Sequence, residues 1–251
     1  MLETVVVTAS AGTFPGLVEA LRAIPVAVEE HPLMNFGPPS DWTLLDSALE
    51  HWDSYSAVAF TSPRAAAAVL ERMAGRRPRD QNVPVLWAGG PATAAALGDE
   101  IGLVRTPRES DAEMLGAAEA LAQAMLNGGV GGTVLFPCEN SRRDELPERL
   151  RSRGIAVDEV VCYRSVLASE SAASAAAARG TMLVVASPTV ANLLVRACPR
   201  TPRPDLLAVG PTTAASARAS GWAPAAVASS PSAEALAAAV RDVLARRAVH
   251  E

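Results

Sequence analysis

Four short turns combine hydroxyl, glycine and proline residues directly after apolar runs that are typical of buried strands. The turns are Thr61-Ser62-Pro63, Gly89-Gly90-Pro91, Ser187-Pro188 and Gly210-Pro211-Thr212-Thr213. Ser or Gly followed by Pro is typical of a helix start, where unpaired N–H groups and the helix dipole favour anions. A single Ser-Pro pair is explained more simply as a helix cap. Four such turns, two in each half of the chain, favour a site for an anionic ligand.

Three further candidates leave their role open. Asn140-Ser141-Arg142-Arg143 follows an apolar run and is expected to begin a helix that ends at Gly154. Arg142, and Arg64 beside the first turn, oppose the helix dipole. Each arginine therefore lies either on a solvated face or beside an anion. Tyr163, one of two tyrosines, follows the apolar run 157–162, and an isolated tyrosine of this kind is usually explained by amphipathic packing.

Composition and motifs argue against several classes of protein. Lys and Arg total 22 against 27 Asp and Glu, a net charge of −5, so no nucleic-acid or acidic-membrane partner is expected. The three cysteines and three histidines are scattered, which predicts neither a disulfide framework nor a metal site. No turn matches a nucleotide-phosphate loop. The absence of a cationic leader and of an apolar run of about 18 residues predicts a cytoplasmic protein.

An internal repeat organises the elements that carry these turns. Residues 4–7, 21–22 and 27–30 match residues 133–136, 150–151 and 156–159 at a constant offset of 129 positions. The segment from Ser62 to Leu115 matches the segment from Ser187 to Leu236 in residue type and order. The chain therefore has the form A1–B1–A2–B2. Strands alternate with helices in each piece, which predicts parallel sheets in two α/β domains.

One helix of this pattern has its own start signal. Ser110 and Glu113 form an S-x-x-E capping box, which predicts a single helix that runs to about Leu126.

An ordered set of short motifs spans nearly the whole chain. The set consists of Phe60-Thr61-Ser62-Pro63-Arg64-Ala65, Leu135-Phe136-Pro137 with Ser141-Arg142, Val161-Cys162-Tyr163-Arg164, Ala186-Ser187-Pro188, Val209-Gly210-Pro211-Thr212-Thr213-Ala214, and Ser230-Pro231-Ser232-Ala233-Glu234-Ala235-Leu236. Together the motifs resemble the uroporphyrinogen-III synthase family. Two details depart from that pattern: the first Gly-Pro turn reads Ala88-Gly89-Gly90, and the second Ser-Pro lacks a preceding Phe-Thr.

The resemblance implies how the repeated pieces combine. It predicts two flavodoxin-like parallel-sheet domains with crossed pairing, A1 with B2 and B1 with A2. The first domain is then discontinuous, residues 1–35 plus 167–251, and the second spans 37–163. Two hinge strands, at about 28–36 and 158–167, are expected to join them.

The resemblance also implies an activity. The expected reaction cyclises hydroxymethylbilane, a linear tetrapyrrole rich in carboxylates, to uroporphyrinogen III in haem biosynthesis, with loss of water and inversion of ring D. Tyr163 matches the family's candidate general acid, and neither a metal nor a cofactor is implied. The residues expected to bind substrate are Thr61, Ser62, Arg64, Gly90, Thr93, Asn140, Arg142, Ser187, Pro188, Thr212 and Thr213.

Two further expectations and one alternative complete the interpretation. The protein is expected to be a monomer and to receive its substrate by transient hand-over from hydroxymethylbilane synthase. The alternative is a non-catalytic, two-lobed binding or sensor protein for an anionic tetrapyrrole, which has the same fold and turns.

Overall fold

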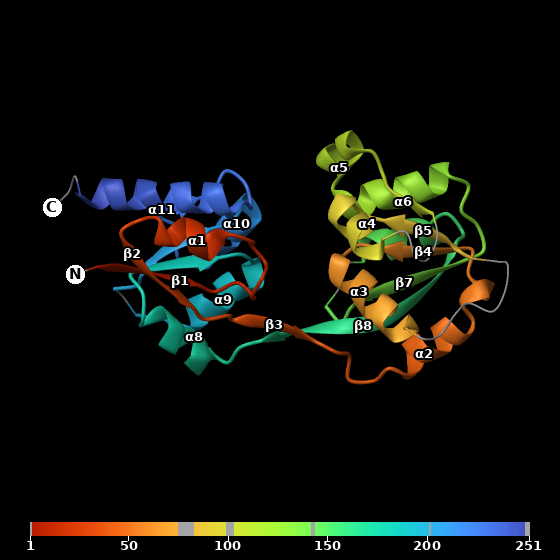
Figure 1. Ribbon diagram of the computed structural model, residues 1–251, viewed down its shortest axis with the longest axis horizontal. Helices are drawn as coiled ribbons and strands as arrows, with labels where there is room; N and C mark the ends of the chain where they lie inside the picture. Colours follow the sequence, from red (N-terminus) through yellow and green to blue (C-terminus); the bar gives the residue numbers. More distant parts are fainter. Residues whose placement is uncertain (1, 75–82, 99–102, 142–143, 201, 249–251) are drawn as a thin grey trace. The chain divides into compact units, whose positions relative to one another are not determined.

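The computed structural model describes residues 2–74, 83–98, 103–141, 144–200 and 202–248. The chain divides into two compact units, one of Met1–Asn35 with Val166–Glu251 and one of Phe36–Ser165 (Figure 1). The sequence placed the corresponding domains at 1–35 plus 167–251 and at 37–163.

The first unit is built on a five-stranded parallel sheet. Its strands are β1 (Glu3–Val7), β2 (Val26–Glu30), β9 (Met182–Val185), β10 (Asp205–Ala208) and β11 (Ala226–Val227). They lie in the order β2-β1-β9-β10-β11. Along this unit's chain that order is second, first, third, fourth and fifth, which is the doubly wound flavodoxin-like order.

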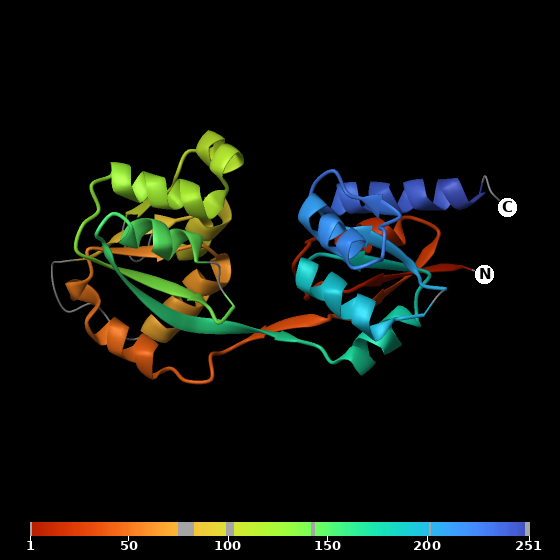
Figure 2. The ribbon, with the colours of Figure 1, turned by 180° about the vertical axis from the view of Figure 1, so that it is seen from behind.

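Helices cover both faces of this sheet (Figures 1 and 2). One face packs against α1 (Leu17–Arg22) and α11 (Ala233–Ala248). The other face packs against α8 (Glu170–Ala177), α9 (Pro188–Ala197) and α10 (Pro211–Ala219). Both faces are therefore apolar, and strands such as β9 are buried throughout.

The second unit repeats this plan with one additional strand. Its strands are β3 (Met34–Gly37), β4 (Ala57–Phe60), β5 (Val85–Ala88), β6 (Val104–Arg105), β7 (Thr133–Glu139) and β8 (Ala156–Leu167), in the order β3-β8-β7-β4-β5-β6. From β8 to β6 the neighbours are parallel. The offset of 129 residues makes β7 the counterpart of β1 and β8 the counterpart of β2. The order β8-β7-β4-β5-β6 therefore corresponds strand by strand to the order β2-β1-β9-β10-β11 of the first unit.

The helices of the second unit again form two layers. The helical elements are α2 (Thr43–Glu50), η1 (Trp52–Ser54), α3 (Pro63–Met73), α4 (Pro91–Leu97), α5 (Glu109–Leu115), α6 (Ala117–Asn127) and α7 (Glu145–Arg151). Helices α2, α3 and α4 pack on one face of the sheet, and α6 and α7 pack on the other. The fold is therefore an α/β protein with two parallel-rich sheets, as the sequence predicts.

Three local expectations differ from the structure. The strand expected at about 28–36 is interrupted, because β2 ends at Glu30 and β3 begins at Met34; Pro32, between them, has no N–H to donate to a ladder. The helix expected from Ser110 to Leu126 is two helices, because Gly116 adopts a φ of 85° between α5 and α6. Ser110 lies inside α5 and is not its cap.

The third difference concerns the segment after β7. Helix α7 begins at Glu145, with Asp144 as its N-cap, and not at Asn140. The backbone of Asn140 instead continues along β8, donating to the carbonyl of Tyr163. Arg142 and Arg143 lie outside the described residues.

The glycine before β9 is required by close packing. A Cβ on Gly180 would lie 2.6 Å from Cγ2 of Val6 and 3.1 Å from the carbonyl oxygens of Thr4 and Met182. We expect Gly180→Ala to lower the free energy of unfolding by about 1–3 kcal/mol, because the buried Val6 and the strand backbone have no space to yield. Urea denaturation measures this.

Gly131→Ala is the matched control, because nothing lies within 4 Å of the position that its Cβ would take. It should change the free energy of unfolding by no more than about 0.5 kcal/mol. Equal unfolding midpoints for the two variants would contradict the packing argument.

Candidate functional site

The carboxyl ends of the parallel strands in the second unit bring the predicted turns to one edge of the sheet. Strand β4 ends at Phe60 and leads into Thr61-Ser62-Pro63, and β5 ends at Ala88 and leads into Gly89-Gly90-Pro91. Strand β7 ends at Glu139, which pairs with Tyr163 of β8 after a register shift between Cys138 and Glu139. The tyrosine and two of the predicted turns therefore share this edge.

Ser62 begins α3 as the sequence predicts. Its backbone is extended (φ −146°, ψ 147°), and its Oγ accepts a hydrogen bond from the N–H of Ala65 at 3.1 Å, with Pro63 in the first helical turn. This cap uses one lone pair of the hydroxyl oxygen and leaves the hydroxyl proton available.

The hydroxyl of Tyr163 lies 3.1 Å from Oγ of Ser62. Burial raises the pKa of Tyr163 above its usual value near 10, while the hydrogen bond with Ser62 lowers it and the charge of Glu139 raises it. The phenol is therefore protonated at neutral pH. When Ser62 is the donor in this hydrogen bond, the proton of the Tyr163 hydroxyl is free to be given to a ligand. The same hydrogen bond then stabilises the phenolate that remains after the proton has left. This arrangement suits a general acid.

Two hollows in the second unit meet at Tyr163. One, of about 560 Å³, is lined mainly by apolar and aromatic residues, among them Phe36, Trp42, Arg64 and Tyr163. The other, of about 330 Å³, is lined by Tyr163 and by polar groups that include Thr61, Ser62, Glu139, Ser141 and Glu145. A proton held on Tyr163 is therefore within reach of ligands that enter from either side.

Arg64 has an aromatic support. Its guanidinium carbon lies 3.8 Å from the centroid of the Phe36 ring. The Phe36 ring in turn lies 6.1 Å from the Tyr163 ring, with an angle of 57° between the planes. Arg64 is exposed, so its positive charge is offered at the same edge as the phenol.

The other predicted residues of this unit differ in what they can contact. Gly90 is the extended N-cap of α4, whereas Thr93 is buried within that helix. Asn140 is exposed, but its Oδ1 accepts a hydrogen bond from the N–H of Ser165 at 3.1 Å, which ties the end of β7 to β8. The side chain of Thr93 is therefore turned into the fold, whereas Asn140 retains its amide N–H groups.

The first unit places its two turns at the carboxyl edge of its own sheet. Ser187 caps α9, accepting from the N–H of Val190 at 3.2 Å, and Pro188 is the first residue of that helix. Thr212 is exposed at the start of α10. Thr213 is buried, and its hydroxyl donates to the carbonyl of Ala186 at 3.2 Å. The single proton of the Thr213 hydroxyl thus serves the fold.

Sequence reasoning missed residues that the repeat could have located. Neither Phe36 nor Glu139 belongs to a motif found in the sequence, and of the two the repeat helps only with Glu139. Ser10 is the counterpart of Glu139 at the offset of 129, and its hydroxyl donates to the carbonyl of Met34. Thr8, fully buried, donates to the carbonyl of Val184 at 2.7 Å. The repeat therefore marks the turn after β1 as part of the carboxyl edge.

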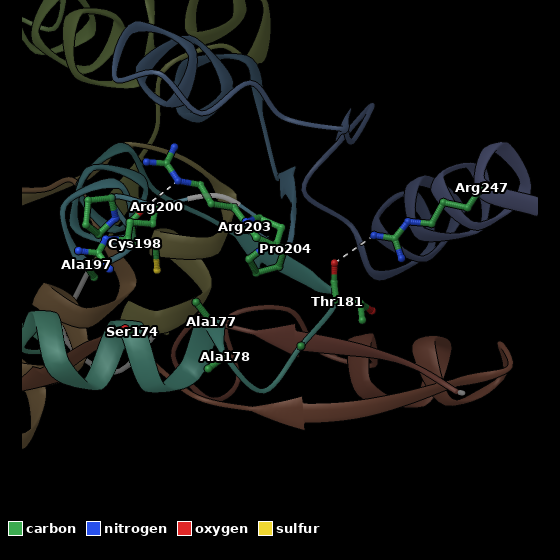
Figure 3. Close-up of a pocket in the computed structure, with 13 residues that line it drawn as sticks. Ser174, Ala177, Ala178, Thr181, Ala197, Cys198, Arg200, Arg203, Pro204 and Arg247 are labelled. Carbon is green, nitrogen blue, oxygen red and sulfur yellow. Dashed lines mark hydrogen bonds between the residues drawn. The ribbon is translucent and has the colours of Figure 1, made fainter. Parts of the chain in front are cut away.

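A larger hollow, of about 660 Å³, lies at the opposite edge of the first unit's sheet, where β9 and β10 begin (Figure 3). Two of the three arginines that line it, Arg203 and Arg247, are engaged within the fold. Arg247 contacts Glu3 and Asp205 at 2.8 Å each. Arg203 donates to the carbonyls of Cys198 and Gly221 and lies over the Trp222 ring. Size alone therefore does not identify the site, and ligands of open parallel sheets bind at the other edge.

Metal-binding clusters and membrane-spanning helices are both absent from the part of the chain that the structure describes. Within it, no three His, Cys, Asp or Glu side chains are grouped closely enough to hold a metal ion. Within the same residues, no helix combines the length and apolarity needed to cross a membrane.

Comparison with known sequences gives one family. A family model described as Uroporphyrinogen-III synthase HemD matches residues 16–238. The curated uroporphyrinogen-III synthase of Synechococcus elongatus is 29% identical over 167 residues. That match covers 65% of this chain and 61% of the relative, which is less than two thirds of the relative's length.

Comparison with solved structures gives the same fold. A mutant uroporphyrinogen III synthase from Thermus thermophilus is similar with a TM-score of 0.68 at 15% identity, over 97% of this chain and 99% of that one. The uroporphyrinogen-III synthetase of Helicobacter pylori is similar with a TM-score of 0.59 at 20% identity, over 98% and 100%. At these identities the likeness shows the architecture.

Proposed function

The chain belongs to the uroporphyrinogen-III synthase HemD family, and on that premise we propose that it converts hydroxymethylbilane to uroporphyrinogen III with loss of water and inversion of ring D. The observation that carries the proposal within this chain is the protonated phenol of Tyr163, held by Ser62 between two hollows at the carboxyl edge of a parallel sheet. That is where such sheets bind ligands.

The proposed first step is loss of the hydroxyl group from the hydroxymethyl carbon. The C–O bond breaks, the phenol proton of Tyr163 moves to the departing oxygen to form water, and the pyrrole nitrogen supplies electrons to the carbon. The result is an azafulvene cation and a phenolate, which the hydrogen bond from Ser62 stabilises. General acids of this kind typically contribute about 10²–10⁴-fold to a rate.

The following steps need positioning more than further chemical groups. The substituted carbon of ring D attacks the azafulvene and gives a spiro intermediate, which fragments and closes again with ring D reversed. The ring carbon that closes the macrocycle then loses a proton, which restores the phenol of Tyr163. Without a protein the linear substrate closes to the uninverted isomer, so the protein must hold a folded conformer.

The carboxylates of the substrate are proposed to meet donors at the helix starts of both units. Thr61, Arg64 and Thr212 support this proposal because their side chains are exposed and carry donor groups. Ser187 retains a hydroxyl proton to donate. Thr213, whose hydroxyl proton is already used, is proposed to contribute through its backbone, so Thr213→Ala should leave activity largely intact.

The proposal is tested by supplying hydroxymethylbilane and identifying the isomer that accumulates. A synthase gives isomer III faster than spontaneous closure gives isomer I. A non-catalytic tetrapyrrole sensor binds the ligand but leaves isomer I as the product, and that outcome overturns the proposal. Sedimentation of the same sample tests the expected monomer, and addition of hydroxymethylbilane synthase tests the expected hand-over.

Ser62→Ala should show the dual role of this hydroxyl. Loss of the cap is expected to lower the free energy of unfolding by about 1 kcal/mol. Loss of the bond to the Tyr163 oxygen should lower kcat by about 3- to 10-fold, which is the value of one neutral hydrogen bond. Steady-state kinetics and thermal unfolding measure the two effects.

Ser169→Ala is the matched control, because Ser169 caps α8 through the N–H of Ala172 at 3.2 Å and takes no part in the site. It should lose similar stability with an unchanged kcat. Equal kcat values for the two variants would remove Ser62 from the reaction.

A further inference from the structure

The apolar hollow beside Tyr163 contains two arginines on aromatic rings, and the two differ in what they offer a ligand. Arg72 lies 5.0 Å from the centroid of Trp42 and donates to both carboxylate oxygens of Asp46, at 2.6 and 2.7 Å. Its charge is therefore compensated. Arg64, over Phe36, has no carboxylate partner among the described residues. Arg64 is thus the cation that this hollow presents to an incoming anion.

Phe36 contacts both groups that a reacting ligand must meet. Its ring supports the guanidinium of Arg64 at 3.8 Å and packs against the Tyr163 ring at a centroid distance of 6.1 Å. Strand β3 forms the edge beside β8, which is why Phe36 reaches Tyr163. A planar guanidinium held on an aromatic face has fewer conformations to lose when it binds a carboxylate.

The size and lining of the hollow suit an aromatic ring with acidic arms. Its volume of about 560 Å³ lies in the range of ordinary ligand pockets. Trp42, Ala67 and Ala68 supply apolar wall. The polar part of the lining consists of Arg64, Tyr163, Glu71 and Arg72, whose charge Asp46 compensates. A five-membered aromatic ring with carboxylate arms matches this combination.

We propose that this hollow is the subsite for the terminal pyrrole ring that carries the hydroxymethyl group, and that Phe36 is the positioning residue that holds Arg64 against an acidic arm of that ring. The inference rests on the proposed function and adds to it the binding place of the terminal ring. With the arm on Arg64 and the ring against the apolar wall, the hydroxymethyl oxygen is directed to the phenol of Tyr163.

The test compares Phe36→Leu, which keeps apolar bulk without an aromatic face, with Phe36→Tyr, which keeps the face. Phe36→Leu should raise KM about 5- to 10-fold, in line with the loss of one cation–π contact and its pre-organisation. It should also increase the share of isomer I, because the terminal ring is then held less firmly. Phe36→Tyr should stay within about 2-fold of the parent KM.

Arg64→Gln supplies the second arm of the test, since this exposed residue can change without disturbing the core. It should raise KM in the parent protein and have a much smaller effect in the Phe36→Leu background, because the two residues act together. Equal effects of Arg64→Gln in both backgrounds, or an unchanged KM in Phe36→Leu, overturn the inference.

A binding measurement separates this inference from the proposed function. Calorimetry uses a monopyrrole with one acetate and one propionate arm, the repeating unit of the substrate. The parent protein should bind it, and Phe36→Leu and Arg64→Gln should each bind it several-fold more weakly, whether or not the parent makes isomer III. Equal binding by all three proteins refutes the subsite, whereas isomer I from the parent refutes the function alone.

Discussion

Replacing Tyr163 by Phe should lower kcat by about 10²–10⁴-fold, the usual contribution of a positioned general acid. The phenol hydroxyl lies 3.1 Å from Ser62 Oγ and has no other hydrogen-bond partner among the described residues. Its removal therefore takes away the proton donor and leaves the aromatic packing against Phe36 in place. Product binding and thermal unfolding should stay close to those of the parent, and single-turnover kinetics measure the chemical step.

The second tyrosine supplies the matched control. The hydroxyl of Tyr55 donates to Oδ2 of Asp158 at 3.1 Å, and burial together with that carboxylate raises the pKa of Tyr55 to about 12. Tyr55→Phe should cost about 1 kcal/mol of stability and leave kcat unchanged. A folded Tyr163→Phe protein with normal kcat and an unchanged isomer ratio would remove Tyr163 from the mechanism and leave conformational control as the catalytic device.

The pH dependence of kcat follows from the protonation of the Tyr163 phenol. The protonated phenol is the active form, and burial raises the pKa of Tyr163 above its usual value near 10. The phenol therefore stays protonated at neutral and mildly alkaline pH, and kcat should fall only at a higher pH than for an ordinary tyrosine. A tyrosine-dependent loss of kcat near pH 8 would contradict this assignment.

Phe60→Ala should destabilise the second unit alone. Phe60 is fully buried at the end of β4, in the core that α2 and α3 cover. Removal of a buried phenyl ring costs about 3–5 kcal/mol. The core clusters of the first unit contain no residue of the second. Hydrogen exchange should therefore show lost protection in peptides from 36–165 and retained protection in 2–35 and 166–248.

Leu183→Ala gives the reciprocal experiment, because Leu183 is fully buried in β9 of the first unit. Its cost of about 2–5 kcal/mol should appear in peptides 2–35 and 166–248. If either substitution exposes β1 and β4 together, as expected for a unit made of residues 1–125, the crossed pairing is wrong.

Much of the fold follows from local signals in the sequence. Short apolar runs predict β4, β9 and β10, and Ser62 and Ser187 cap the helices that they are predicted to begin. These features depend on neighbouring residues, so spacing is enough to find them. The repeat shows which pieces are alike, but not which pieces pair. That pairing joins β1 to β9 across about 176 positions and came from the family resemblance.

Contacts between distant residues account for most of what the sequence did not predict. Tyr163 and Ser62 are 101 positions apart, and only the folded sheet brings them to one edge. Thr93 and Thr213 occupy equivalent, buried positions, because helix rotation decides whether a hydroxyl faces ligand or core. Phe36 has no local signature, since its role depends on the arginine and tyrosine that tertiary structure places beside it.

A crystal structure of the parent protein with bound tetrapyrrole product tests the placement of the site most directly. The expected structure has the tetrapyrrole at the carboxyl edge of the second unit's sheet, with an atom next to the Tyr163 hydroxyl and a carboxylate on Arg64. A tetrapyrrole held instead by Arg200 and Arg203, in the hollow at the opposite edge of the first unit's sheet, with nothing beside Tyr163, would contradict both the assigned site and its chemistry.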